Sequence, residues 1–198
     1  MQTFIHRLSR AVSLTGLLLA TITAAAADAR DDIFRAYQKM MSSRFTVDMT
    51  TVSGGDASKA HGDYETVERI HLKREGMEII VVPEGTWMRS GSDWIQSPID
   101  MSGMVKEIIP KSIDEMRAAI QNATDAGMTT WDGQPVHSYT YDVDTAIMGI
   151  HATSKYKIFV GAVGQIVHVE SDGEAMGRIS LTKQDIRYDD SIRVTAPN

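Results

Sequence analysis

The sequence predicts an α+β fold in which a strongly curved antiparallel sheet is covered on its concave face by an N-terminal helix and short helices. Two observations carry this prediction. Apolar residues alternate with polar ones along many short segments separated by tight turns, which is typical of an antiparallel meander. Only three segments show helical periodicity, so part of a sheet of about ten strands stays uncovered. Such a sheet favours an internal apolar cavity.

The first 27 residues indicate a secretory signal peptide. Arg7 and Arg10 form a basic start, residues 11–22 are apolar, and residues 24–27 are small side chains at the A-x-A cleavage spacing. The apolar run is about 12 residues, short of the roughly 20 that a membrane-spanning helix needs. The alternative is a buried N-terminal helix of the folded domain. We expect export to the periplasm, cleavage, and a single domain of residues 28–198 that does not span the membrane.

Composition excludes several classes of function. The chain has no cysteine, which removes disulfides, thiol nucleophiles, cysteine-type metal sites and a lipid anchor on cysteine. After cleavage the chain has 18 basic and 26 acidic side chains, which gives a net charge of −8. It contains no run of five or more like charges. Because phosphate binding needs clustered basic side chains, we expect no nucleic-acid partner.

The first half of the expected domain begins with a helix and continues as strands. An apolar stripe at helical spacing predicts a helix that ends near residues 42–43. The stripe consists of Ile33, Phe34, Tyr37, Met40 and Met41. Residues 57–63 are polar and predict a loop. Alternation predicts strands over residues 45–50, 64–73, 77–82, 86–89 and 94–96.

The second half is predicted to pass through helices and return to strands. Residues 102–109 show helical spacing, and Ser112 with Glu115 forms a capping box for a second helix that closes over residues 121–127. Residues 145–153 predict a loop or short helical passage, and Asp172–Gly173 predicts a turn. The expected strands are 128–131, 136–144, 155–160, 165–170 and 178–188, with a last strand at Ile192 and Val194.

Three stretches resemble the family of periplasmic carriers and sensors with the LolA-like fold. They are Trp131–Val136 as a turn into a central strand, Val160–Ile166 as a hairpin, and Tyr188–Pro197 as a terminal strand with a closing proline. Members of this family include lipoprotein carriers, mycobacterial lipid-carrying lipoproteins and a sigma-factor regulator. The resemblance implies an incomplete barrel that holds an acyl chain. The carrier subfamily also uses a buried arginine near the cavity, and this role is assigned to no arginine of this chain.

The candidate ligand site is an apolar cluster where the first meander meets the covering helix. We expect it to line the mouth of the cavity, although ordinary core packing is the alternative for each residue. Burial of a sixteen-carbon chain contributes roughly 12 kcal/mol before the costs of binding, so no specific polar contact is needed. The cluster consists of Trp87, Met88, Trp94, Ile95, Met101, Met104 and Ile108.

Motifs for catalysis and metal binding are not found in the sequence. None of the histidines has H-x-x-x-H, H-E-x-x-H or H-x-H spacing, and no G-x-S-x-G, G-x-G-x-x-G or P-loop pattern occurs. We therefore expect no metal, no organic cofactor and no enzymatic activity. The leading hypothesis is a soluble periplasmic carrier of a lipid or an acylated lipoprotein. The alternatives are an envelope-assembly or stress-sensing factor that binds an inner- or outer-membrane protein through the same cleft, and an exported hydrolase.

Overall fold

The computed structural model describes residues 15–98, 117–147, 150–175 and 177–197. They form one long helix, α1 (Thr15–Met41), and eleven strands. The strands of the first half are β1 (Phe45–Ser53), β2 (Asp56–Thr66), β3 (Arg69–Arg74), β4 (Met77–Val82), β5 (Gly85–Ser90) and β6 (Asp93–Gln96). Those of the second half are β7 (Gln121–Trp131), β8 (Gln134–Ile147), β9 (Ile150–Val160), β10 (Ile166–Ala175) and β11 (Arg178–Tyr188).

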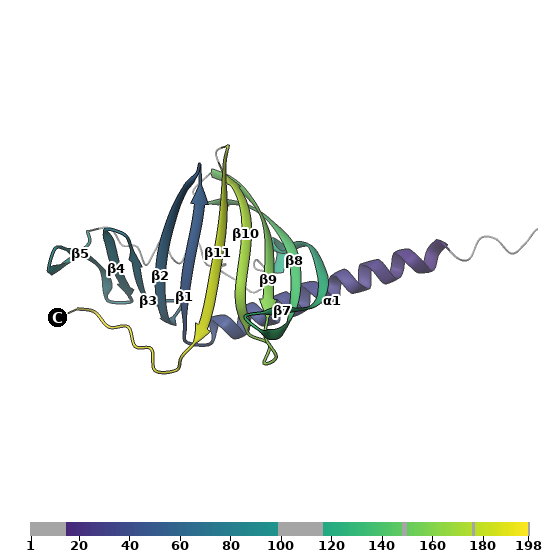
Figure 1. The fold of residues 1–198 in the computed structure, drawn as a ribbon, viewed down its shortest axis with the longest axis horizontal. Helices are drawn as coiled ribbons and strands as arrows, with labels where there is room; N and C mark the ends of the chain where they lie inside the picture. Colours follow the sequence, from purple (N-terminus) through teal and green to yellow (C-terminus); the bar gives the residue numbers. More distant parts are fainter. Residues whose placement is uncertain (1–14, 99–116, 148–149, 176, 198) are drawn as a thin grey trace, which may run out of the picture.

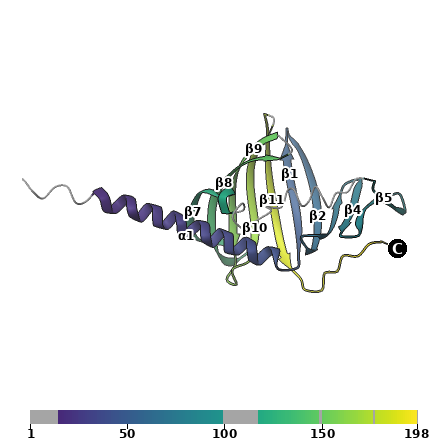
Figure 2. The same ribbon diagram turned by 180° about the vertical axis from the view of Figure 1, so that it is seen from behind.

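All eleven strands belong to one antiparallel sheet that does not close. The strand order is β6-β5-β4-β3-β2-β1-β11-β10-β9-β8-β7, so β6 and β7 are the two edges. Each half of the chain forms a meander, and β1 joins the halves by pairing with β11 over nine residues. Figures 1 and 2 show the sheet curling around the C-terminal part of α1, which lies on the concave side. We call the side of the sheet that faces α1 the inner face and the opposite side the outer face.

Tight turns of predictable chemistry connect neighbouring strands. Ser53 pairs with Asp56, so the loop between β1 and β2 is Gly54–Gly55 alone, and both glycines have positive φ. A two-residue loop with positive φ at both positions is a type I′ turn, whose twist matches that of a hairpin. The loop between β7 and β8 is built in the same way from Asp132–Gly133, with φ of 47° and 72°. The turn predicted at residues 131–136 is thereby confirmed, although the strand that it enters, β8, lies next to the edge strand β7.

The main core lies between α1 and the inner face. Ile33 and Ala36 of α1 are buried against side chains from both halves of the sheet. Tyr37 and Met40, one turn further along, pack at the border of the same core. The sheet contributes Phe45, Val47, Ala123, Tyr139, Tyr141, Ile158, Val160, Ile166, Val169 and Ile186. Because α1 contacts mainly β7, and β10 to a lesser extent, the helix lies mostly over the second half of the sheet, and from the first half Phe45 and Val47 of β1 join the same core.

The strands β3 to β6, which we call the wing, extend beyond the part of the sheet that α1 covers (Figure 1). The outer face of the wing forms a second, smaller core. Ile80, Val82 and the rings of Trp87 and Trp94 pack there against the C-terminal residues 192–196. Figure 1 shows the C-terminal segment leaving β11 and running back alongside β3 and β4. The wing is therefore held from its outer side by the end of the chain.

The fold class, the N-terminal helix and most strands are confirmed. The apolar stripe from Ile33 to Met41 lies in the last two turns of α1, and the hairpin at residues 161–164 connects β9 to β10. Within the described residues, no helix has both the length and the hydropathy that crossing a membrane requires. The helix over residues 102–109 and the capping box lie outside the described residues, and residues 117–119 form a single helical turn.

Several element predictions are wrong, and most errors share one cause. Residues 57–63 are part of β2, residues 121–127 are part of β7, Asp172–Gly173 lies inside β10, and residues 145–147 and 150–153 extend β8 and β9. These stretches are polar or small, which suggested loops. They form strands because the strands next to them in the sheet supply partners for their backbone hydrogen bonds. Their outer-face side chains can be polar because water solvates that face.

Two further predictions concern strand limits. The single strand predicted over residues 64–73 is two strands, since β2 ends at Thr66 and β3 begins at Arg69. The last strand predicted at Ile192 and Val194 is wrong, because residues 189–197 belong to no strand. The alternation in this segment reflects packing against the wing, without pairing in the sheet.

Candidate functional site: the inner face of the sheet

The register of the sheet separates charged from uncharged side chains. Residues paired directly across antiparallel strands lie on the same face, so each row of partners can be followed from strand to strand. On the inner face the central rows of β1, β11, β10 and β9 carry no charge. These rows are Met49, Gln184, Val169 and Ile158, followed by Thr51, Thr182, Ser171 and Tyr156. The matching outer-face rows are Asp48, Asp185, His168 and Phe159, followed by Thr50, Lys183, Glu170 and Lys157.

The outer face pairs its charges with one another. Lys183 lies 3.2 Å from Glu170, and Arg187 pairs with Asp48. His61 stands between two carboxylates, 2.7 Å from Asp48 and 3.0 Å from Asp63. The hydrogen bond with Asp48 raises the pKa of His61 above its ordinary value, against an opposing effect of partial burial. This pairing is typical of a solvated sheet surface, so the outer charges need no ligand to explain them.

Beyond the part covered by α1, the inner face is lined by small side chains. Thr51 and Thr182 share a hydrogen bond of 3.1 Å, and Ser180 and Ser154 flank Gly173 one row further along. All five residues are only partly buried. Small side chains in this row leave the inner face open toward the ends of the strands.

The inner face of the wing carries exposed apolar side chains. Met88 pairs with Ile95 on one side and with Ile79 on the other, so the three side chains share one face. Met77 follows on the same face two residues before Ile79. Ile79 is buried, whereas Met77 is 41%, Met88 39% and Ile95 56% exposed. We call Met77, Ile79, Met88 and Ile95 the inner-face patch, which is a contiguous apolar surface of the kind that marks binding sites.

The four described members of the predicted cluster divide between the two faces of the wing. Met88 and Ile95 belong to the inner-face patch. Trp87 and Trp94 point to the outer face, where they pack in the second core, and Trp94 lies near the ring of His71. The division follows from the strand period of two, which sends adjacent residues to opposite faces. Met101, Met104 and Ile108 lie outside the described residues.

Sequence reasoning missed Met77 and Ile79 as members of the apolar surface. Both were predicted to lie in a strand, and the strand limits are confirmed. The missing information was the register between β4 and β5, which places Ile79 opposite Met88. The short turns at residues 83–84 and 91–92 fix this register. Pairing the residues on either side of each turn, one by one, places Ile79, Met88 and Ile95 on the same face.

Tyrosines line the deep end of the inner face. The hydroxyls of Tyr37 and Tyr141 lie 2.7 Å apart, and the ring of Tyr141 stacks on Tyr156 at 5.0 Å. Tyr139 donates to Asp32 of α1 at 3.2 Å. Burial raises the pKa of Tyr139 to about 12 and also raises that of Tyr141. These hydroxyls therefore stay neutral and join α1 to the sheet.

The outer face holds a buried histidine beneath an aromatic ring. His168 is 1% exposed, its Nδ1 lies 2.7 Å from Asp185, and Trp131 stacks on its ring at 3.6 Å. Among the described residues its Nε2 has no hydrogen-bond partner, and the carboxylate of Glu170 is 3.7 Å away. No group of three or more histidine or acidic side chains within the described ranges has the geometry to hold a metal ion. His168 thus packs as part of a small outer cluster with Phe159.

Comparisons with known proteins identify the fold. No protein-family model and no curated protein matches the chain. The structure is similar to LprF from Mycobacterium bovis, with a TM-score of 0.58 and 9% identity over 87% of this chain and 98% of LprF. It is also similar to the Mycobacterium tuberculosis lipoprotein LppX, with a TM-score of 0.55 and 9% identity over 85% of this chain and 99% of LppX.

A third similar structure comes from a protein complex. A chain of the Pseudomonas aeruginosa MucA/MucB complex matches with a TM-score of 0.51 and 13% identity, over 86% of this chain and 59% of that one. At these identities the likeness concerns the fold. The open eleven-stranded sheet, the helix on its inner face and these three similarities together show that the chain has a LolA-like fold.

Proposed function

We propose that the chain is a binding protein that carries a lipid, or the acyl chain of a lipoprotein, against the inner face of its sheet. The observation that supports this most directly is the inner-face patch. Three of its side chains, Met77, Met88 and Ile95, are exposed on a face whose central rows carry no charge. Binding of an apolar ligand over this face removes exposed apolar surface from water, which lowers the free energy.

The chemistry of the patch suits an acyl chain. Each methylene group moved from water to an apolar surface contributes about 0.8 kcal/mol, so half of a sixteen-carbon chain supplies roughly 6 kcal/mol before binding costs. Two of the exposed side chains are methionines, whose flexible thioethers adapt to ligands of varied shape. Around Gly173 the same face carries the small side chains of Ser154 and Ser180.

We also propose where the protein works. Export by a signal peptide of residues 1–27 leaves a single domain of residues 28–198 in the periplasm, where lipids and lipoproteins need a carrier between membranes. The proposed role is transport without catalysis, metal or organic cofactor. It agrees with the similarity to LppX, which is described as a lipoprotein.

The test is lipid binding by charge variants of the patch. Protein purified from the periplasm is analysed by native mass spectrometry before and after incubation with phosphatidylethanolamine and phosphatidylglycerol vesicles. We expect bound lipid with the wild type and at least about a tenfold loss with Met88→Glu and Ile95→Glu, because a carboxylate on the patch must be desolvated when lipid binds. The matched control is Val163→Glu in the turn between β9 and β10, which is 65% exposed and far from the wing.

Three outcomes contradict the proposal or part of it. If the wild type carries no lipid even after incubation, the carrier function is wrong. If the two patch variants bind as much lipid as Val163→Glu, the ligand site lies elsewhere. If the purified protein hydrolyses lipid esters and keeps this activity through repeated purification, the chain is an enzyme.

A second candidate function is the recognition of a protein partner. The observation that favours it is the match to a chain of the MucA/MucB complex, in which two proteins associate. In that case the protein is an envelope-assembly or stress-sensing factor. A stable complex with an inner- or outer-membrane protein, formed while the inner face holds no lipid, supports this function over transport.

A further inference from the structure

The C-terminal segment, residues 189–197, is held like a bound peptide. It belongs to no strand, yet Ile192, Val194 and Ala196 turn toward the wing, while Arg193 and Thr195 between them are exposed. Val194 is the most deeply buried of these residues, at 3% exposure. The surface beneath it, which we call the outer groove, consists of Ile80, Val82, Trp87 and Trp94.

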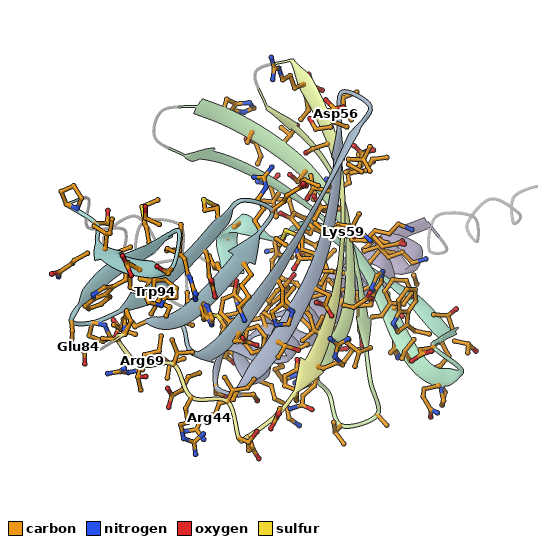
Figure 3. All side chains as sticks on the ribbon, turned by 60° about the vertical axis from the view of Figure 1, so that its left-hand side comes forward. Arg44, Asp56, Lys59, Arg69, Glu84 and Trp94 are labelled. Carbon is orange, nitrogen blue, oxygen red and sulfur yellow. The ribbon has the colours of Figure 1, made fainter. Side chains whose placement is uncertain are left out.

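The main chain of the segment is held at its centre by side chains. Glu65 accepts a hydrogen bond of 2.9 Å from the amide of Val194, and Arg69 donates one of 3.1 Å to the carbonyl of the same residue. Arg69 is in turn held by Glu84, 2.9 Å away. Figure 3 shows Arg69, Glu84 and Trp94 together on the wing, beside the yellow C-terminal segment. Both backbone groups of Val194 are therefore bound without a neighbouring strand.

A third contact ties the start of the segment to the body of the sheet. Arg44, which precedes β1, donates a hydrogen bond of 2.8 Å to the carbonyl of Asp190. Figure 3 shows Arg44 at the end of the molecule where β11 passes into the segment. The amide of Asp189 also donates a hydrogen bond of 3.1 Å to the carbonyl of Arg44. Beyond this main-chain bond the segment contacts the protein through a few side chains and three apolar residues, and it lacks the continuous ladder that holds each strand. Segments with so few contacts open locally, without unfolding of the whole domain.

This arrangement has the parts of a peptide-recognition site. Proteins that bind extended peptides fix the main chain by hydrogen bonds and read alternate side chains in apolar pockets. Here Glu65 and Arg69 bind the two backbone groups of one residue, Val194, and the two tryptophan rings pack against the apolar side of the segment. Because these two hydrogen bonds go to backbone groups, any residue except proline, which lacks the amide hydrogen, can make both at the central position. Selection then rests on apolar side chains at every second position.

We propose that the outer groove is a recognition site for an extended segment of a partner protein with apolar residues at every second position, and that the C-terminal segment occupies it in the free protein. The tethered segment competes at an effective concentration of the order of millimolar. A partner therefore displaces it only when its own segment binds more tightly or is itself delivered at a high local concentration. This site is separate from the inner-face patch, which lies on the other side of the same strands.

The test measures binding of a labelled peptide of residues 189–198 to the full chain by fluorescence anisotropy. The variant Val194→Asp of the protein removes its own occupant from the groove, because a carboxylate cannot be buried there unpaired. We expect this variant to bind the peptide saturably and at least about tenfold more tightly than the wild type, whose tethered segment competes. The same change within the peptide should weaken binding at least about tenfold.

The matched peptide control is Thr195→Asp, which places the same charge one position further along, on the exposed side. This peptide should bind within about threefold of the unchanged one, since its charge stays in water. The proposal is overturned if the folded Val194→Asp protein binds no peptide saturably, or if it binds the Val194→Asp and Thr195→Asp peptides equally well.

A second measurement applies if the Val194→Asp protein fails to fold. Hydrogen exchange of the wild type compares the amide of Val194 with the amide of Ile158. Ile158 lies in the interior strand β9 and is 0% exposed. If the segment is displaceable, the amide hydrogen of Val194 exchanges at least about a hundredfold faster than that of Ile158, because the segment opens locally. Equal exchange rates would mean that the segment leaves only on global unfolding, and the groove would then be ordinary core.

Discussion

Removing one hydroxyl from the pair formed by Tyr37 and Tyr141 tests how α1 is held against the sheet. The two oxygens lie 2.7 Å apart at the edge of the main core, and Tyr141 is 5% exposed. The change Tyr37→Phe keeps the ring that packs edge-on against Tyr141 at 6.4 Å and deletes only the bond. The remaining hydroxyl of Tyr141 is then buried without this partner.

The expected cost follows from that unsatisfied group. A buried hydroxyl that loses its hydrogen bond destabilises a protein by about 1–3 kcal/mol, whereas removing both partners is nearly neutral. Tyr37→Phe and Tyr141→Phe should therefore each lower the free energy of unfolding by about 1–2 kcal/mol. The double variant should cost no more than either single one, which gives a coupling energy of at least about 1–2 kcal/mol.

Urea denaturation followed by circular dichroism measures all four proteins. A loss of 1 kcal/mol corresponds to a melting temperature lower by about 2–4 °C for a domain of this size, which provides a second readout. The matched control is Tyr64→Phe, because the Tyr64 ring stacks on Phe45 at 4.7 Å and no hydrogen bond of its hydroxyl occurs within the described residues. If the two single effects simply add in the double variant, the hydroxyl pair does not hold α1 in place.

Two further predictions concern stability and its dependence on pH. A Cβ at Gly62 would lie 2.8 Å from the ring of Tyr64, so Gly62→Ala should cost about 1–3 kcal/mol in urea denaturation. Gly173→Ala should cost less, because the Cβ there meets a seryl hydroxyl at 2.9 Å that can rotate away, and a larger loss at Gly173 would contradict the argument. The raised pKa of His61 means that its bond with Asp48 contributes stability fully below pH 6.5 and loses it as the pH rises through the folded-state pKa. His61→Gln should thus lower the urea midpoint more at pH 5.5 than at pH 8.5, and a difference that is constant across this range would refute the reasoning.

The candidate site was only partly predictable from the sequence. Strand and turn signals located β4, β5 and β6 and placed Met88 and Ile95 among the apolar residues of the first meander. They also grouped Trp87 and Trp94 with these two residues, because a count of apolar residues along the chain does not record the face of each one. The pairing of Met88 with Ile95 is what separates the two sets.

The C-terminal segment shows a different limit of sequence reasoning. The alternation at Ile192, Val194 and Ala196 correctly indicates one apolar side, and it predicts a strand because strands are the usual source of period two. In the structure the segment has an apolar side but does not pair with a strand, because side chains from β2 and β3 supply the hydrogen bonds of Val194. A pattern of side chains carries no information about which groups bind the main chain.

The sequence by itself determined the local features of this protein: the helical stripe that ends at Met41, the turn at Asp132–Gly133, and the antiparallel class of the sheet. These features depend on residues close together in the chain, whose propensities act locally. Only the tertiary structure decided which polar stretches are strands and which face of each strand is the inner one. The polar stretches are strands because neighbouring strands pair with them. The two halves of the sheet share one inner face because β1 pairs with β11, whose residues lie more than 120 positions apart, and long-range pairing of that kind leaves no local pattern.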